Sequence, residues 1–104
     1  MPTQLLTITY YLGVFMSRYY FSSHIAWQIE KVNNQVYVLD RVNNATYLFS
    51  KVSRDIWKMI SFKLTVDDMS EFIAERYHID RSLACKDIKA FIESLQNEGL
   101  IYEE

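Results

Sequence analysis

The apolar residues of this chain change their spacing at Ser50, and this change constrains the fold more than any other feature. Before Ser50 they alternate with polar residues, which is typical of strands that bury one face. After Ser50 they recur every three or four residues, which is typical of amphipathic helices. The sequence therefore predicts an α+β domain in which a small sheet comes first and a helical bundle follows.

Three segments carry the alternating pattern, and a pair of asparagines follows each of the first two. Asparagine tolerates positive φ, so each pair predicts a tight turn, the first of them with two residues. Strands joined in this way form an antiparallel meander, whose last strand is an edge with unpaired backbone donors and acceptors. In that strand Tyr47 and Phe49 share one face, and Thr46 and Leu48 share the other. The predicted strands are His24 to Val32, Gln35 to Asp40 and Ala45 to Phe49, with turns at Asn33-Asn34 and Asn43-Asn44.

Three helices follow, and each has a start signal. Ser50 is a candidate N-cap of the first helix and Asp80 of the third. Thr65 with Asp68 three residues later has the pattern of a capping box for the second helix. Gly99 ends the third helix at its C′ position. The apolar stripes are Val52, Ile56, Trp57 and Ile60 in the first helix, Val66, Met69, Ile73 and Tyr77 in the second, and Ala84, Ile88, Phe91, Ile92 and Leu95 in the third.

The residues that carry chemistry in other proteins are sparse here. A single cysteine, Cys85, excludes an internal disulfide and a multi-cysteine metal site, and it fits the reducing cytoplasm. Asp67 and Asp68 are adjacent in a predicted helix, so they do not share a face and are better suited to capping than to acid–base catalysis. No nucleophile–base pair, phosphate loop or set of metal ligands is present. The sequence therefore predicts a protein that is not an enzyme and holds no cofactor.

The first 24 residues contain an apolar run, Leu5 to Met16, without a sustained helical or strand period. It falls short of the roughly 20 apolar residues that span a bilayer, and neither a preceding cation nor a cleavage site marks it as a signal peptide. Three interpretations remain open: an extra strand or helix packed on the domain, an interface for a homodimer, or an over-long start whose initiator is Met16. The sequence thus divides into a hydrophobic extension, 1–24, and a domain, 25–104.

Between residues 26 and 101 a series of short motifs appears at defined spacing. The motifs are Tyr47-Leu48-Phe49-Ser50, Ile56-Trp57, Leu64-Thr65-Val66-Asp67-Asp68, Ala74-Glu75-Arg76-Tyr77, Ile79-Asp80, Asp87-Ile88, Phe91-Ile92, and Leu95 through Gly99-Leu100. The order and spacing of this series resemble the PqqD-like family of peptide-binding domains, also called RiPP precursor peptide recognition elements. Two positions depart from the family pattern. Ser61-Phe62 stands where an Asp-Gly turn is usual, and Ser50 stands where asparagine is common.

The resemblance implies a winged-helix-like α+β domain that binds the leader region of a ribosomal precursor peptide. Such a domain modifies nothing itself and presents the peptide to a modifying enzyme, for example a radical-SAM enzyme or a lasso-type leader peptidase. The resemblance places the peptide as an added strand against the third strand, next to the third helix. Backbone hydrogen bonds to that edge would provide sequence-tolerant affinity, and apolar pockets would select leader side chains.

The expected binding residues lie on the third strand and on one flank of the third helix. The strand contributes Ala45, Thr46, Tyr47, Leu48 and Phe49. The favoured flank of the helix contributes Cys85, Lys89 and Ile92, because Lys89 beside Ile92 suits an acidic leader residue above an apolar pocket. The opposite flank, Leu83, Asp87 and Ala90, remains the alternative.

A winged-helix DNA-binding regulator is the alternative function, since three helices beside a small sheet are also the elements of such proteins. The third helix argues against it. Its cations Arg81, Lys86 and Lys89 are interspersed with carboxylates, so it lacks the basic stripe that a helix in the major groove requires. We therefore expect a peptide partner rather than nucleic acid or a membrane.

Overall fold

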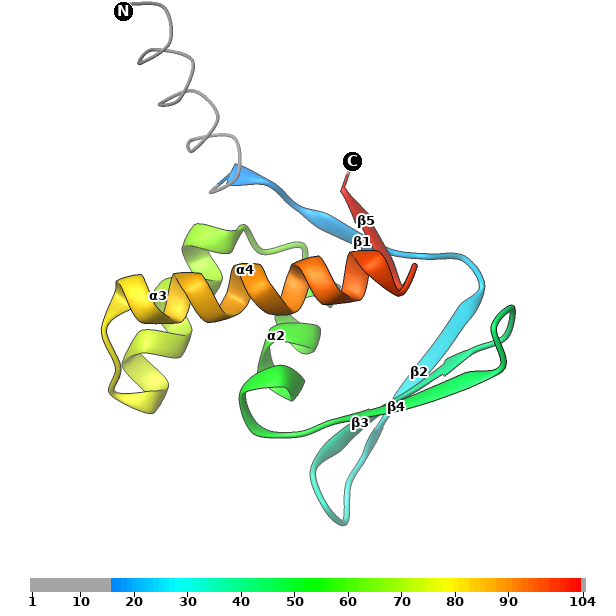
Figure 1. Ribbon diagram of the computed structural model, residues 1–104. Coiled ribbons are helices and arrows are strands. Elements are labelled where there is room, and N and C mark those ends of the chain that lie inside the picture. Colours follow the sequence, from blue (N-terminus) through cyan, green and yellow to red (C-terminus); the bar gives the residue numbers. More distant parts are fainter. Residues whose placement is uncertain (1–15, 104) are drawn as a thin grey trace, which may run out of the picture.

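The computed structural model describes residues 16–103, which form a three-stranded sheet, three helices and a two-stranded ribbon (Figure 1). The sheet lies at one end of the molecule, α2 occupies the middle, and α3 packs along α4. The predicted α+β architecture, a three-stranded antiparallel sheet followed by three helices, is confirmed. The elements are β1 (Tyr19–Phe21), β2 (Ile25–Glu30), β3 (Gln35–Asp40), β4 (Ala45–Phe49), α2 (Lys51–Ser61), α3 (Val66–Tyr77), α4 (Arg81–Asn97) and β5 (Ile101–Glu103).

The three-stranded sheet is the predicted meander, with antiparallel strands in the order β2-β3-β4. The middle strand turns Val36 and Val38 inward, and neither side chain is exposed. In the register of the sheet Val36 lies opposite Phe49 and Val38 lies opposite Tyr47, so these pairs share the inner face. The alternation seen in the sequence thus separates a core face from an outer face along β3 and β4 and along β2 as far as Trp27, while Ile29 near the end of β2 is exposed.

The first hairpin loop is longer than the predicted two-residue turn, whereas the second runs from Asp40 to Ala45 as predicted. Glu30 pairs with Gln35, so the first strand ends at Glu30 rather than at Val32, and four residues form the loop. The reason is the Glu30 carboxylate, which accepts hydrogen bonds at 2.9 Å from the backbone N–H groups of Val32 and Asn33 and so turns the chain early. The next loop repeats this design ten residues later. There Asp40 Oδ1 accepts bonds at 3.0 Å from Val42 N and Asn43 N.

Asparagine ends each of these loops in the left-handed region. Asn34 and Asn44 both have a φ of 53°, which confirms the expected use of paired asparagines for positive φ. The buried Asp40 holds the second loop more firmly, because its Oδ2 also accepts a bond at 2.8 Å from the Asn43 side chain. These loops set the register of the strands and therefore the position of β4.

The helix start signals differ in how they are realised. Thr65 and Asp68 form the predicted capping box, in which Thr65 Oγ1 accepts from Asp68 N at 3.1 Å and Asp68 Oδ2 accepts from Thr65 N. Ser50 and Asp80 stand at the N-cap positions of α2 and α4, but neither side chain makes a capping hydrogen bond, so that part of the prediction is wrong. Both residues are exposed, and water can meet the first N–H groups of their helices.

The end of α4 follows the prediction for Gly99. Its φ is 75°, and the bonds Gly99 N to Gln96 O and Leu100 N to Leu95 O, both 3.0 Å, form a Schellman motif. Leu100 is fully buried behind this turn. The reversal directs the last residues of the domain back along the helix and into β5.

The ribbon of β1 and β5 was not predicted as an element. The two strands pair antiparallel, Phe21 opposite Ile101, and Phe21 stacks on Trp57 with ring centroids 4.4 Å apart. Tyr19 of β1 is buried as well. Residues 19–21 therefore form a strand packed on the domain, within the segment that the sequence assigned to the extension. Residues 1–15 lie outside the described part of the chain, so the three interpretations of the run from Leu5 to Met16 and the division at residue 24 stay predictions.

The core centres on Trp57 of α2, which is fully buried as expected. Its indole lies against Phe49 from the sheet, Phe21 from the ribbon and Trp27 from β2, with centroid separations of 5.4, 4.4 and 6.1 Å. One aromatic cluster thus joins three parts of the fold that are far apart in sequence. Because Phe49 belongs to this cluster, the core also holds β4 in place beside α4.

Candidate functional site

Strand β4 has β3 on one side only, so its other edge has no strand partner among residues 16–103. Every second residue of such a strand directs its N–H and C=O groups away from the sheet. These groups are hydrogen-bonding positions that a further extended segment can occupy. The prediction that Ala45 to Phe49 form an edge strand is confirmed.

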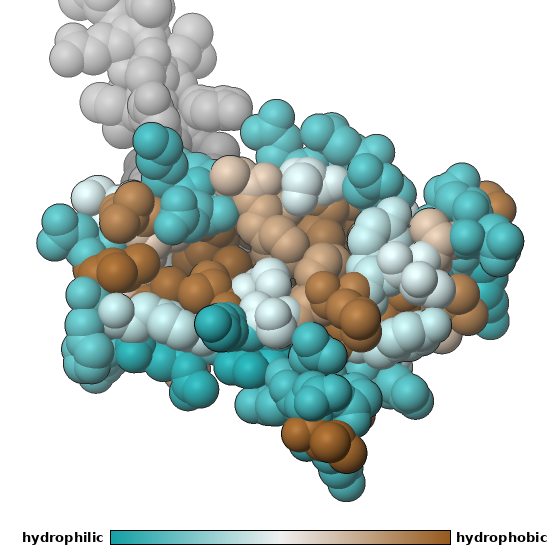
Figure 2. Space-filling model, turned by 60° about the horizontal axis from the view of Figure 1, so that its bottom comes forward, coloured by the Kyte–Doolittle hydropathy of each residue, from teal (hydrophilic) through white to brown (hydrophobic). Residues whose placement is uncertain are grey.

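The two faces of β4 differ in exposure as the alternation predicts. Tyr47 and Phe49 are half-buried on the inner face, and Thr46 and Leu48 are exposed on the outer face, Leu48 to 60%. Figure 2 shows the face of the molecule that points downward in Figure 1, on which apolar side chains gather with hydrophilic side chains around them. The edge of β4 therefore combines unpaired backbone groups with the exposed side chain of Leu48.

Helix α4 meets β4 through two side chains. The ring of Phe91 packs edge-on against Phe49 with centroids 5.2 Å apart, and Glu98 Oε2 accepts a hydrogen bond of 3.1 Å from the Tyr47 hydroxyl. Burial raises the pKa of Tyr47, and the bond to the Glu98 carboxylate raises it further, so the hydroxyl stays protonated as a donor at neutral pH. These two contacts, here called the β4–α4 junction, hold the helix against the strand beside the free edge of β4.

The favoured flank of α4, which carries Cys85, Lys89 and Ile92, does not contribute to the β4–α4 junction formed by Phe91 and Glu98. Cys85 and Ile92 are 8% and 3% exposed and belong to the core, and Lys89 is half-buried. Helical spacing places Cys85 about 120° around the helix axis from Phe91. The peptide-binding role of Cys85, Lys89 and Ile92 stays a prediction that no contact in the structure tests.

On the opposite flank, helical spacing places Asp87 about 40°, Leu83 about 80° and Ala90 about 100° around the helix axis from Phe91. Leu83, Asp87 and Ala90 are exposed, and Asp87 stands one turn before Phe91, which touches β4. Phe91 and Glu98 themselves were not predicted as site residues. Their separation of seven residues places them on one helical face, but the sequence assigned Phe91 to the core stripe and did not single out Glu98 as a site residue.

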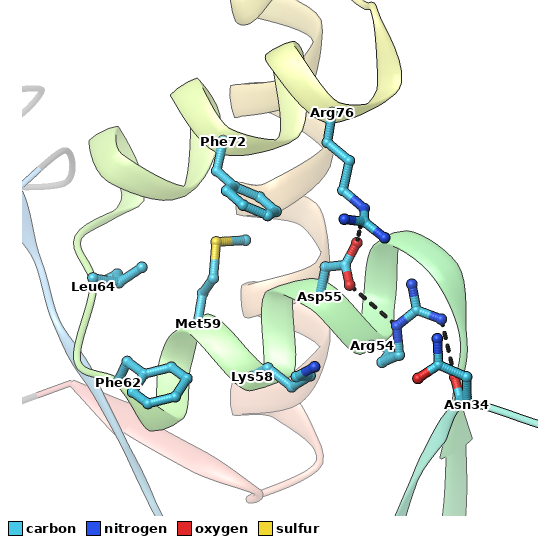
Figure 3. Close-up of a pocket in the computed structure, with 9 residues that line it drawn as sticks. All are labelled: Asn34, Arg54, Asp55, Lys58, Met59, Phe62, Leu64, Phe72 and Arg76. Carbon is cyan, nitrogen blue, oxygen red and sulfur yellow. Dashed lines mark hydrogen bonds and ion pairs between the residues drawn. The ribbon is translucent and has the colours of Figure 1, made fainter. Parts of the chain in front are cut away.

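A concave surface, separate from the edge of β4, lies between α2 and α3 (Figure 3). At its polar end the buried Asp55 binds three side chains: Arg54 Nε and Arg76 Nε at 3.1 Å each, and the Tyr77 hydroxyl at 2.6 Å. No sequence signal predicted this surface. Its lining residues are Asn34, Arg54, Asp55, Lys58, Met59, Phe62, Leu64, Phe72 and Arg76.

Two further features bear on function, metal ligation and membrane spanning. Between residues 16 and 103, the structure brings no three His, Cys, Asp or Glu side chains together at metal-binding distances. No helix in that range is long and apolar enough to cross a bilayer. The edge of β4 beside α4 is the candidate binding site.

Comparison with known proteins matches this arrangement to a class of small α+β domains. The family model described as "Coenzyme PQQ synthesis protein D (PqqD)" matches residues 35–101, most of the chain, and the protein belongs to the PqqD family. The resemblance seen in the sequence is thereby confirmed. None of the curated proteins matches the chain.

Two solved structures share the fold. One is entitled "TbiB1 in Complex with the TbiA(beta) Leader Peptide", with a TM-score of 0.72, 18% identity, and coverage of 78% of this chain and 92% of that one. The other is "Lasso peptide synthetase B1 complexed with the leader peptide", with a TM-score of 0.75, 18% identity, and coverage of 82% and 98%. At this identity the similarity shows a common fold.

Proposed function

We propose that this protein binds the leader region of a ribosomally made precursor peptide as an added strand on β4 and presents it to a modifying enzyme. The free edge of β4 beside α4 is the observation that carries the proposal. The family and the fold support it, since both similar structures are by title complexes with a leader peptide. In this role the protein performs no chemistry on the peptide.

Strand addition suits a partner that is disordered before it binds. Backbone hydrogen bonds along Ala45–Phe49 supply affinity whatever the side chains are, and alternate side chains of the peptide supply selectivity. Residues of the added strand on the inner side would lie toward Phe91, and those on the outer side would lie beside Leu48. An apolar leader residue thus has a partner on either face.

On the side of the proposed leader site that α4 forms, we favour the flank of Leu83, Asp87 and Ala90. The contacts of Phe91 and Glu98 with β4 support this choice, because helical spacing places Asp87 about 40° from Phe91 around the helix axis and Cys85 about 120° from it. Asp87 and Glu98 are both carboxylates, so this flank suits a leader with a cationic residue near an apolar one. The flank of Cys85, Lys89 and Ile92 would instead suit an acidic residue. The two flanks therefore predict opposite charges on the leader residue that lies beside α4.

The first experiment titrates the full chain with the leader segment of a precursor encoded beside its gene and follows backbone amide shifts. We expect saturable shifts at Thr46 and Leu48 with a Kd at or below about 10 μM. Leu83→Ser and Asp87→Lys should weaken binding, and Lys89→Glu should not. Absence of shifts in β4 would contradict strand addition.

A proline pair tests the edge directly. Successive N–H groups of a strand point to opposite edges, so in Ala45→Pro and Thr46→Pro one lost N–H faces β3 and the other faces the free edge. We expect one variant to lose stability and the other to keep its cooperative melt while binding the leader at least about tenfold more weakly. Full leader affinity in both folded variants would rule out backbone pairing at this edge.

The DNA-binding alternative gains no observation from the structure. Arg81 at the start of α4 pairs with Asp67 of α3, and carboxylates are interspersed along the rest of the helix. A salt-dependent shift of duplex DNA by the full chain would revive it.

A further inference from the structure

The concave surface between α2 and α3, here called the α2–α3 pocket, has an apolar end with two unusually exposed rings. Phe62 is 73% exposed and Phe72 is 45% exposed, while Met59 and Leu64 form the floor beneath them. In Figure 3 these four side chains converge on one half of the pocket. Its volume of about 330 Å³ suits one or two bulky apolar side chains rather than a large ligand.

The other half of the pocket is positively charged. Arg54, Lys58 and Arg76 line it, and Asp55 is the single carboxylate among the lining residues. That carboxylate is already engaged, since Oδ1 binds Arg54 and Oδ2 binds Arg76. The positive charge therefore exceeds the negative charge, and it adjoins the exposed rings.

The pocket does not overlap the proposed leader site. In Figure 3 α4 passes behind α2 and α3, so the pocket opens on the side of the helical layer away from α4. The contacts that define the leader site, Phe91 with Phe49 and Glu98 with Tyr47, lie at the junction of α4 and β4. Both surfaces can therefore be occupied at the same time.

We propose that the α2–α3 pocket docks an amphipathic helical segment of a partner protein, with apolar anchors one turn apart and carboxylates beside them. The anchors would cover Phe62 and Phe72, and the carboxylates would lie against Lys58 and Arg76. Resting on the proposed function, the partner is the enzyme that receives the bound peptide. A docking surface away from the peptide holds that enzyme close without competing for the leader.

The test uses the full chain and two synthetic helical peptides of about fourteen residues. Both carry leucine at helical spacing, flanked by glutamate in one peptide and by lysine in its twin. We expect the glutamate peptide to shift the Met59 methyl and Phe72 ring resonances, with a Kd below about 1 mM. The lysine twin should bind at least about fivefold more weakly.

Variants assign this binding to the pocket. Phe62→Ser and Lys58→Glu should each weaken the glutamate peptide at least about fivefold, since they remove an exposed anchor and a cation. Val42→Ser is the matched control, because Val42 is an apolar side chain that is 70% exposed on a hairpin loop. No shift at about 1 mM, equal binding of the twins, or shifts at Thr46 in place of Met59 would overturn the proposal.

Other occupants give distinct results that would also overturn it. A concentration-dependent dimer abolished by Phe62→Ser would make the partner a second copy. Binding to anionic vesicles that Phe62→Ser abolishes, without binding of the glutamate peptide, would make the surface a membrane site. A nuclear Overhauser contact between the Leu5 or Leu6 methyls and Phe72 in the free chain would make this protein its own ligand.

The leader titration separates this inference from the proposed function. Phe62→Ser should keep full leader affinity and lower the rate at which the partner enzyme modifies the bound precursor. If the leader fails to bind while the glutamate peptide binds, the proposed function fails and the docking surface stands. Loss of leader affinity in Phe62→Ser would mean that the two sites are one, and the inference would fall.

Discussion

The hydroxyl of Tyr47 on β4 donates a hydrogen bond of 3.1 Å to Glu98 Oε2 at the end of α4. These residues are 51 positions apart, and the bond ties the candidate binding edge to the helix beside it. Removing the hydroxyl in Tyr47→Phe should lower the free energy of unfolding by about 1 kcal/mol. Chemical denaturation measures this change. Tyr37→Phe, on the outer face of the sheet, is the control and should change it less.

Trp57 has the largest buried side chain, and its indole Nε1 has no hydrogen-bond partner among residues 16–103. Trp57→Phe therefore loses ring area but no hydrogen bond, and we expect it to cost about 1–2 kcal/mol of unfolding free energy. Trp57→Ala removes the centre of the aromatic cluster and should cost about 3–5 kcal/mol. Equal losses in the two variants would contradict the packing role of the ring, because Trp57→Phe keeps an aromatic ring and Trp57→Ala does not. Thermal melts compare them.

Asp55 is the centre of an ion network with Arg54 and Arg76, and its side chain is 10% exposed. Asp55→Ala would leave the nearly buried Arg54 without its carboxylate, so we expect a loss of about 3 kcal/mol in denaturation. Asp67→Ala is the matched control, because Asp67 pairs with Arg81 at side chains that are 45% and 54% exposed. Its loss should stay below about 1 kcal/mol.

Asp40 makes the stability of the β3–β4 loop depend on pH. The backbone N–H of Asn43 is the largest influence and lowers the pKa of Asp40 below its ordinary value of 3.8, although burial acts in the opposite direction. A carboxyl group whose pKa is lowered by folding stabilises the folded state above the unfolded pKa and loses that contribution as the pH falls through the folded pKa. The protection of the Val42 and Asn43 amides against exchange, relative to the intrinsic exchange rate at the same pH, should therefore fall below pH 3.8.

The variant Asp40→Asn provides the comparison for this pH dependence. It cannot ionise, so the part of the stability loss between neutral pH and about pH 3 that Asp40 causes should disappear. Asp67→Asn changes a partly exposed carboxylate and should leave the stability loss that Asp40 causes unchanged. An acid response identical in Asp40→Asn and the natural protein would contradict this role for Asp40.

Gly99 ends α4 with a φ of 75°, and an added Cβ there would meet no atom within 4 Å. The cost of Gly99→Ala is therefore conformational alone, and we expect about 1 kcal/mol less unfolding free energy. The reciprocal change is His78→Gly, at a C-cap whose φ is 54°. It should be neutral or stabilising because glycine relieves the same strain. A stability loss in His78→Gly would show that the imidazole packs productively.

Features that depend on neighbouring residues along the chain were predictable. The three strands of the sheet, the capping box of Thr65 and Asp68, and the reversal at Gly99 are each encoded within a few residues. The burial of Trp57 follows in the same way from the helical spacing of apolar residues, and the exposure of Leu48 follows from the alternation along its strand. The family resemblance also rests on this local register, and it predicted β4 as the edge strand.

The sequence alone thus determined the three-stranded sheet, the three helices, their order, the edge strand and the family, because alternation, helical period and capping are local properties. Only the tertiary structure decided that Tyr19–Phe21 pairs with Ile101–Glu103, since three-residue strands carry too little pattern and the pairing spans the chain. It also decided that α4 turns Phe91 rather than Cys85 toward β4. The rotation of a helix about its axis depends on packing against every neighbour at once, and no local spacing records it.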